Sequence, residues 1–162
     1  MHGIDLVDAL KGFILEHTNH LHMATKVNDY FKQPDVYGGY LPPKENARRG
    51  ETEKEPDYYP FVVVRFLGFS DKIATGKTMD VRLIMGTYSE DEQNGWQENV
   101  ILFNAIELAL KEKQAVGAFI LAGEIDYDLF EEQSKPHWHS TAILSFEAPQ
   151  LQIERRGFGD DF

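Results

Sequence analysis

The spacing of apolar residues predicts a helix close to the start of the chain. Ile4, Val7, Leu10 and Ile14 follow one another at intervals of three or four residues, as they do on one face of a helix. This spacing predicts an amphipathic helix over residues 4–17.

The periodic pattern then disappears over residues 18–57, which contain four prolines and many charged residues. A stretch of this length without a regular element is expected to be a long insertion loop, and such loops are often functional. Regular patterning resumes over residues 58–149, which are predicted to form the sheet-and-helix core of one domain spanning residues 1–162. Residues 150–162 are predicted to be a flexible tail.

Four segments of this core have the apolar pattern of β-strands. The first, "YPFVVVRFLGF", is a nearly continuous apolar run, and the second, "TMDVRLIMGTYS", alternates between apolar and polar residues. The short polar stretch between them predicts a hairpin whose tip runs from Ser70 to Lys77. The third and fourth strands are predicted in "AFILAGEIDYDLFEEQ" and "STAILSFEAP".

A second helix is predicted between the two pairs of strands. Asn94 is a plausible N-cap for it, and its apolar residues cover more than one face. A helix with two apolar faces typically packs on its own sheet and also on another subunit. The residues expected at such a subunit interface are Val100, Phe103, Ile106 and Leu110.

The order of these elements is helix, long loop, two strands, helix, two strands, which predicts an α+β fold. We expect a single, mostly antiparallel four-stranded sheet with the two helices packed on one face.

The composition narrows the possible chemistry. The chain has no cysteine, so disulfides and thiolate metal sites are excluded. The formal net charge of −11 argues against a phosphate-binding surface as the main activity, because nucleic-acid affinity depends on clustered Lys and Arg. The start of the chain lacks the pattern of a signal peptide and no apolar run is long enough to span a membrane, so we expect a soluble, intracellular protein.

His137 and His139 are the strongest candidates for a chemical site. Two histidines separated by one residue on an extended segment point the same way and could form half of a metal site, with Asp128, Glu131 or Glu132 as a further ligand. This pattern leaves open a small metal-dependent hydrolase, and the acidic composition leaves open an acidic binding module. No catalytic pattern of nucleophile, base and acid is recognisable, so we expect neither enzymatic activity nor a cofactor.

Three segments, "YYPFVVVRFLG", "MDVRLIMGTYSEDEQNGWQENVILFNAIELAL" and "KPHWHSTAILSFEAP", together resemble the tail terminator (tail completion) proteins of long-tailed bacteriophages and prophages. In that family the second strand ends in a Gly-x-Tyr turn, acids and an Asn-Gly pair precede the long helix, and the last strand begins with a proline and two aromatic residues and closes on Trp/Phe-Glu-x-Pro. The matching positions here are Gly86, Tyr88, Asn94, Gly95, Pro136, His137, Trp138, Phe146, Glu147 and Pro149.

The resemblance implies a structural virion protein without enzymatic activity. It implies a homo-oligomeric ring, usually a hexamer, that sits on the last ring of the tail tube and stops polymerisation of the major tail tube protein. The ring presents a surface to the head–tail connector or neck, and genomic DNA passes through its lumen without specific binding. The hairpin tip is the part expected to contact the tube, through Asp71, Lys72, Ile73 and Lys77.

By the same resemblance, the protein is expected at the head-proximal end of the virion tail, and in the host cytoplasm during assembly, with no membrane partner. The long loop over residues 18–57 departs from the shorter family members. It could face outward, contact a tail sheath or touch the connector, and the resemblance does not decide among these positions.

Overall fold

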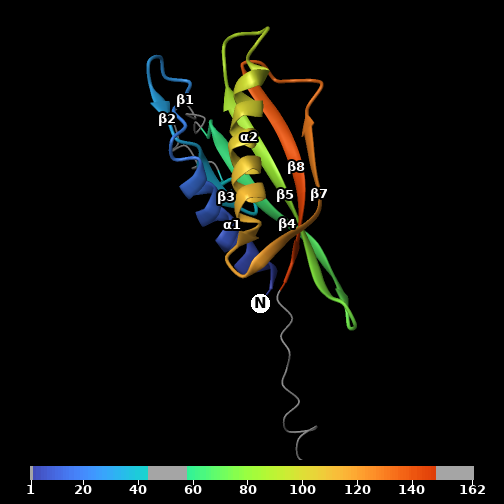
Figure 1. Cartoon of the computed structure of the whole chain (residues 1–162). Helices are drawn as coiled ribbons and strands as arrows, with labels where there is room; N and C mark the ends of the chain where they lie inside the picture. Colours follow the sequence, from blue (N-terminus) through green and yellow to red (C-terminus); the bar gives the residue numbers. More distant parts are fainter. Residues whose placement is uncertain (1, 44–57, 149–162) are drawn as a thin grey trace, which may run out of the picture.

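A computed structural model describes residues 2–43 and 58–148 of the chain. Within these residues the chain forms two helices and eight strands (Figure 1). In chain order the elements are α1 (Gly3–His17), β1 (Met23–Ala24), β2 (Phe31–Lys32), β3 (Asp35–Gly38), β4 (Phe61–Lys72), β5 (Gly76–Tyr88), α2 (Trp96–Lys113), β6 (Ala115–Val116), β7 (Phe119–Leu129) and β8 (His137–Glu147).

Six of these strands form one mixed sheet in the order β3-β4-β5-β8-β7-β6, while β1 and β2 pair separately. β3 runs parallel to β4, whereas all other neighbours in the sheet are antiparallel. The α+β class and the two helices are confirmed, but the prediction of a single four-stranded sheet is wrong. The four predicted strands correspond to β4, β5, β7 and β8.

The strands that the sequence did not predict are short. β1, β2 and β3 all lie within residues 18–57, where a loop was expected, and β6 follows α2 directly. β3 has four residues, and β1, β2 and β6 have two each, so they are too short for an alternating pattern to be recognised. Tertiary pairing defines them instead, since β3 is held against residues 61–64 of β4.

Both helices pack on the same face of the sheet, with α1 against β3 and β4, and α2 against β5 and β8 (Figure 1). Alternate strand residues point into the space between sheet and helices, where they form the core. The buried core residues are Leu6, Leu10, Ile14, Met23, Val62, Val64, Met79, Val81, Leu83, Met85, Leu102, Phe103, Ile106, Leu110, Val116, Phe119, Ala142, Leu144 and Phe146. The opposite face of the sheet, here called the open face, carries the intervening side chains of the strands.

β4 and β5 continue beyond the rest of the sheet as a projecting hairpin (Figure 1). The pairing of β5 with β8 ends at Thr78 and Glu147, whereas β4 and β5 remain paired as far as Lys72 and Gly76. The turn is therefore residues 73–75, which is shorter than the predicted tip.

Neither helix in the described part of the chain combines the length and the hydropathy that a membrane span requires.

Candidate functional site

The projecting hairpin concentrates exposed apolar side chains. Leu67 and Phe69 lie on β4 and Ile73 lies in the turn, and all three are exposed. A β-bulge between Phe66 and Gly68 interrupts the ladder at Leu67, which leaves that side chain outside the core that Phe66 contacts. An exposed apolar cluster on a projecting element is typical of a surface that binds another protein.

The four residues predicted at the hairpin tip all lie in this hairpin. Asp71, Lys72 and Ile73 are exposed, and Asp71 is the pairing partner of Lys77. Lys77 is half-buried, and its Nζ lies 4.1 Å from the centre of the Phe69 ring. The tip thus combines an apolar end with charged residues along its sides.

A cleft of about 510 Å³ lies at the base of the hairpin, where it meets the start of α1 and the end of β3. Arg65 Cζ lies 4.1 Å from the centre of the Tyr40 ring at its border, an arrangement that stabilises a cation over an aromatic face. Neither Arg65 nor Lys77 forms an ion pair with any carboxylate of residues 2–43 and 58–148. The lining residues are His2, Gly3, Ile4, Val7, Gly38, Gly39, Tyr40, Arg65, Phe66, Phe69 and Lys77.

α2 presents different residues on its surface from those predicted at a subunit interface. Phe103, Ile106 and Leu110 belong to the chain's own core, and Val100 is half-buried. The sequence could not tell the two apolar faces apart, because both repeat at helical spacing. The exposed apolar residues of α2 are Trp96, Ile101 and Leu108.

Asn99 anchors α2 to the sheet through a buried polar network that the sequence analysis missed. Its Nδ2 donates to the Met85 and Trp138 carbonyl oxygens, at 3.3 and 3.0 Å. Its Oδ1 accepts hydrogen bonds from the Tyr127 hydroxyl, at 2.9 Å, and from the Ser140 hydroxyl. Burial raises the pKa of Tyr127, which keeps its hydroxyl protonated as a donor.

A signal for Asn99 was present in the sequence. It stands at helical spacing from Phe103, Ile106 and Leu110, so it is a polar residue on an otherwise apolar stripe. A buried amide in such a position must find partners, because an unsatisfied buried polar group is costly.

His137 and His139 lie on the open face among aromatic rings. The Tyr59 ring is centred 4.3 Å from that of His137, and its hydroxyl is hydrogen-bonded to His139 Nε2 at 2.6 Å. Burial, together with the neighbouring His137, lowers the pKa of His139. In the described residues no three His, Asp or Glu side chains lie close enough to hold a metal ion. Both histidines pack against the Tyr59 ring.

Two glycines of the resemblance are required by close packing. A Cβ on Gly86 would collide with the Phe61 ring, and a Cβ on Gly95 would collide with the indole of Trp138. Trp138 is buried, and its Nε1 donates to the Ser89 carbonyl oxygen at 3.1 Å. These positions therefore support the fold of the chain.

Of the other positions of the resemblance, Phe146 is buried in the core, whereas Tyr88, Asn94 and Glu147 lie nearer the surface. The Tyr88 hydroxyl donates to the Glu90 carboxylate at 2.9 Å, and Glu147 is exposed at the end of β8. Asn94 is exposed in the turn before α2, and Pro149 lies outside the described residues.

The helix N-cap position differs by one residue from the prediction, because α2 begins at Trp96 and Gly95 occupies that position. Asp91 organises the preceding turn, since its Oδ1 accepts hydrogen bonds from the backbone N–H groups of Gln93 and Asn94, both at 3.0 Å. These bonds to the charged carboxylate lower the pKa of Asp91.

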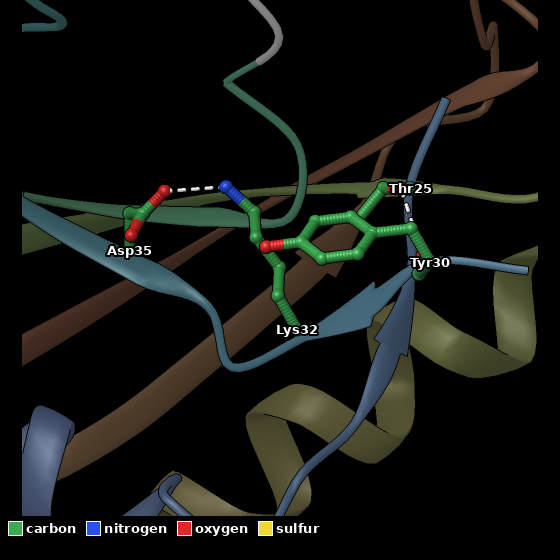
Figure 2. Close-up of polar contacts among 4 residues, drawn as sticks. All are labelled: Thr25, Tyr30, Lys32 and Asp35. Atoms are coloured by element: carbon green, nitrogen blue, oxygen red, sulfur yellow. Dashed lines mark hydrogen bonds and ion pairs between the residues drawn. The ribbon is translucent and has the colours of Figure 1, made fainter. Parts of the chain in front are cut away.

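A small hairpin of β1 and β2 precedes β3 and is held by polar contacts (Figure 2). The Thr25 hydroxyl donates to the Tyr30 carbonyl oxygen at 2.8 Å, and an ion pair of 2.6 Å joins Lys32 to Asp35. Val27 and Tyr30 are exposed in its turn, so this hairpin presents a second, smaller apolar surface.

No protein-family model matches the sequence, and no curated protein sequence matches it significantly. The function must therefore be inferred from the residues of this chain and from the resemblance of its motifs.

Proposed function

We propose that this chain is a structural virion protein, without enzymatic activity, that forms a ring at the head-proximal end of a phage tail tube. The ring ends polymerisation of the tube and provides the surface to which the head connector joins. Motif resemblance over residues 58–149 motivates the proposal. The single structural observation that supports it most is the projecting β4–β5 hairpin.

The hairpin has the properties of a contact element. The pairing of β4 with β5 holds the turn away from the rest of the sheet. Burial of the exposed Leu67, Phe69 and Ile73 side chains against another protein would stabilise the complex. A ring repeats this hairpin once per subunit on one face. Several weak contacts then act together on the end of a tube, so that the ring binds far more tightly than a single subunit.

The charge of the chain is compatible with a ring through which DNA passes. The formal net charge is −11, and like charges prevent the phosphate backbone from binding to the protein.

Deletion of the gene from its phage or prophage, followed by electron microscopy of the particles, tests this proposal. We expect tails of uncontrolled length that fail to join heads, and restoration of normal particles when the protein is supplied from a plasmid. Tails of normal length joined to heads in the absence of the protein would exclude the proposed function.

A further inference from the structure

The cleft at the base of the β4–β5 hairpin gathers large apolar side chains that the chain leaves uncovered. Ile4, Tyr40 and Phe69 line it, and they are 68%, 71% and 61% exposed. They come from α1, from the residues after β3 and from β4, so three separate segments bring apolar surface to one place. Burial of such surface by a further segment is favourable.

The charged side chains that line this cleft are cationic. Arg65 Cζ and Lys77 Nζ each lie 4.1 Å from a ring centre, that of Tyr40 and that of Phe69 respectively. No Asp or Glu of the described residues lines the cleft. Asp71 pairs with Lys77 across the hairpin, but no ion pair joins their side chains. The cleft is therefore complementary to a segment that combines aromatic rings with carboxylates.

The described part of the chain ends beside this cleft. β8 ends at Glu147, which pairs with Thr78, and the next residue, Ala148, donates its backbone N–H to the Lys77 carbonyl oxygen at 2.9 Å (Figure 1). Lys77 is itself a lining residue of the cleft. Residues 149–162 therefore continue from a point that is one strand away from the cleft.

The sequence beyond Ala148 contains the combination of side chains that fits the cleft. Residues 158–162, Phe-Gly-Asp-Asp-Phe, carry two aromatic rings and two carboxylates, and they are here called the acidic aromatic segment. The two arginines beyond Ala148, Arg155 and Arg156, precede this segment. An extended chain of the length between Ala148 and Phe158 spans roughly 33 Å, which is ample to reach a cleft beside the neighbouring strand.

We propose that the acidic aromatic segment binds in the cleft of its own chain, with its rings on the apolar lining and its carboxylates toward Arg65 and Lys77. Attachment through Ala148 makes this binding intramolecular, with an effective concentration on the order of millimolar. A contact that would be weak between separate molecules is then sufficient. The inference does not rest on the proposed function, because it concerns a contact within one chain.

Disulfide trapping in the full chain tests the contact. The chain has no cysteine, so Ile4→Cys with Gly159→Cys introduces the only thiols and retains the rings and charges that the contact uses. The control variant combines Gly159→Cys with Ile120→Cys. Ile120 is also exposed and pairs with Glu147, but it does not line the cleft. A segment that does not bind in the cleft therefore reaches Ile120 at least as readily as Ile4.

Equilibration in a glutathione redox buffer, followed by mass spectrometry, gives the effective concentration of the two thiols in each variant, and circular dichroism verifies that each is folded. We expect the value for the Ile4→Cys variant to exceed that of the control about tenfold or more. Equal values overturn the proposal. Disulfide-linked dimers in place of internally linked monomers would place the segment in the cleft of a second copy, and would overturn it as well.

Substitutions within the segment test its chemistry in the Ile4→Cys variant. Phe158→Ser with Phe162→Ser should reduce the effective concentration to that of the control, because the apolar lining then has no ring to cover it. Asp160→Asn with Asp161→Asn should reduce it by a smaller factor, since exposed ion pairs contribute less. A phenylalanine-free segment that links as efficiently as the unsubstituted one overturns the proposal.

Leu151→Ser with Ile153→Ser provides the matched control for the phenylalanine substitutions. It also removes two apolar side chains beyond Ala148, but from outside the acidic aromatic segment. The effective concentration should remain unchanged in this variant. If it falls as far as in the phenylalanine variant, the assignment of the contact to residues 158–162 is wrong.

Discussion

The indole of Trp138 lies directly against Gly95, where a Cβ would come 2.5 Å from Trp138 Nε1 and 2.5 Å from the Asp91 carbonyl oxygen. This contact joins the start of α2 to β8, and the indole also donates to the Ser89 carbonyl oxygen. The acidic turn, the helix and the last strand therefore meet at one point. A glycine before the long helix is thus explained by the space that the tryptophan occupies.

Replacing Gly95 with alanine should lower the free energy of unfolding by about 1–3 kcal/mol, because the added methyl group overpacks the contact with the indole and a backbone carbonyl. Urea unfolding followed by circular dichroism measures the change. Gly12→Ala is the matched control, since nothing lies within 4 Å of a Cβ at that position in α1. It should stabilise the chain by about 0.5–1 kcal/mol, and equal effects of the two substitutions would contradict the packing argument.

The Asn99 network makes a second prediction about stability. Asn99→Ala removes the partner of two backbone carbonyls and two hydroxyls, and should lower the free energy of unfolding by about 2–4 kcal/mol. Asn104→Ala, at an exposed position of the same helix, should change it by less than about 0.5 kcal/mol. The same urea titration compares them, and similar values for both variants would show that the network contributes little.

The sequence predicted the elements that carry a long periodic pattern. β4, β5, β7, β8 and both helices are each eleven residues or longer, so their apolar residues repeat often enough to define the period. β3 and β6 have no such repeat. β3 is a strand because it pairs in parallel with β4. Parallel pairing joins segments that are distant in sequence, so it leaves no local pattern that predicts it.

The candidate site was predictable only where it is local. The hairpin tip was found because a polar stretch separates two strand patterns, although the pairing continues closer to the turn than expected. The cleft beside Arg65 lies between the start of α1, the end of β3 and the middle of β4. No local sequence pattern indicates that these segments lie together. Phe103 was predicted at a subunit interface because the sequence does not distinguish the two apolar faces of the helix. In the structure the face that carries Phe103 packs in the core.

The lowered pKa of His139 predicts a loss of stability in mild acid. The folded chain holds His139 neutral because it is buried and lies beside His137, whereas in the unfolded chain its pKa returns to about 6.5. The unfolded state therefore binds more protons than the folded state as the pH falls below about 6.5. The free energy of unfolding is thus unaffected by His139 above that pH, and it decreases as the pH falls further, until the lowered pKa of the folded state has been passed.

Thermal unfolding at about pH 7 and about pH 5 measures this effect. His139→Gln should show a smaller decrease in Tm between the two values than the parent, since its side chain does not titrate. His20→Gln, at an exposed position, should show the same decrease as the parent. If His139→Gln and the parent lose the same amount, protonation of His139 does not cause the loss.

The exposed turn of the β4–β5 hairpin makes a prediction about assembly that is separate from folding. Ile73 is fully exposed in the described structure, so Ile73→Ser should change the free energy of unfolding by less than about 0.5 kcal/mol. If the turn contacts the tail tube, covering this side chain contributes about 1.5–3 kcal/mol per subunit, and its removal should weaken tube binding about tenfold or more. Electron microscopy of purified tubes mixed with increasing amounts of protein gives the fraction of capped ends. Val27→Ser, which removes an exposed apolar residue from the β1–β2 turn instead, should cap tubes as the parent does, and equal loss of capping in both variants would exclude the hairpin as the specific contact.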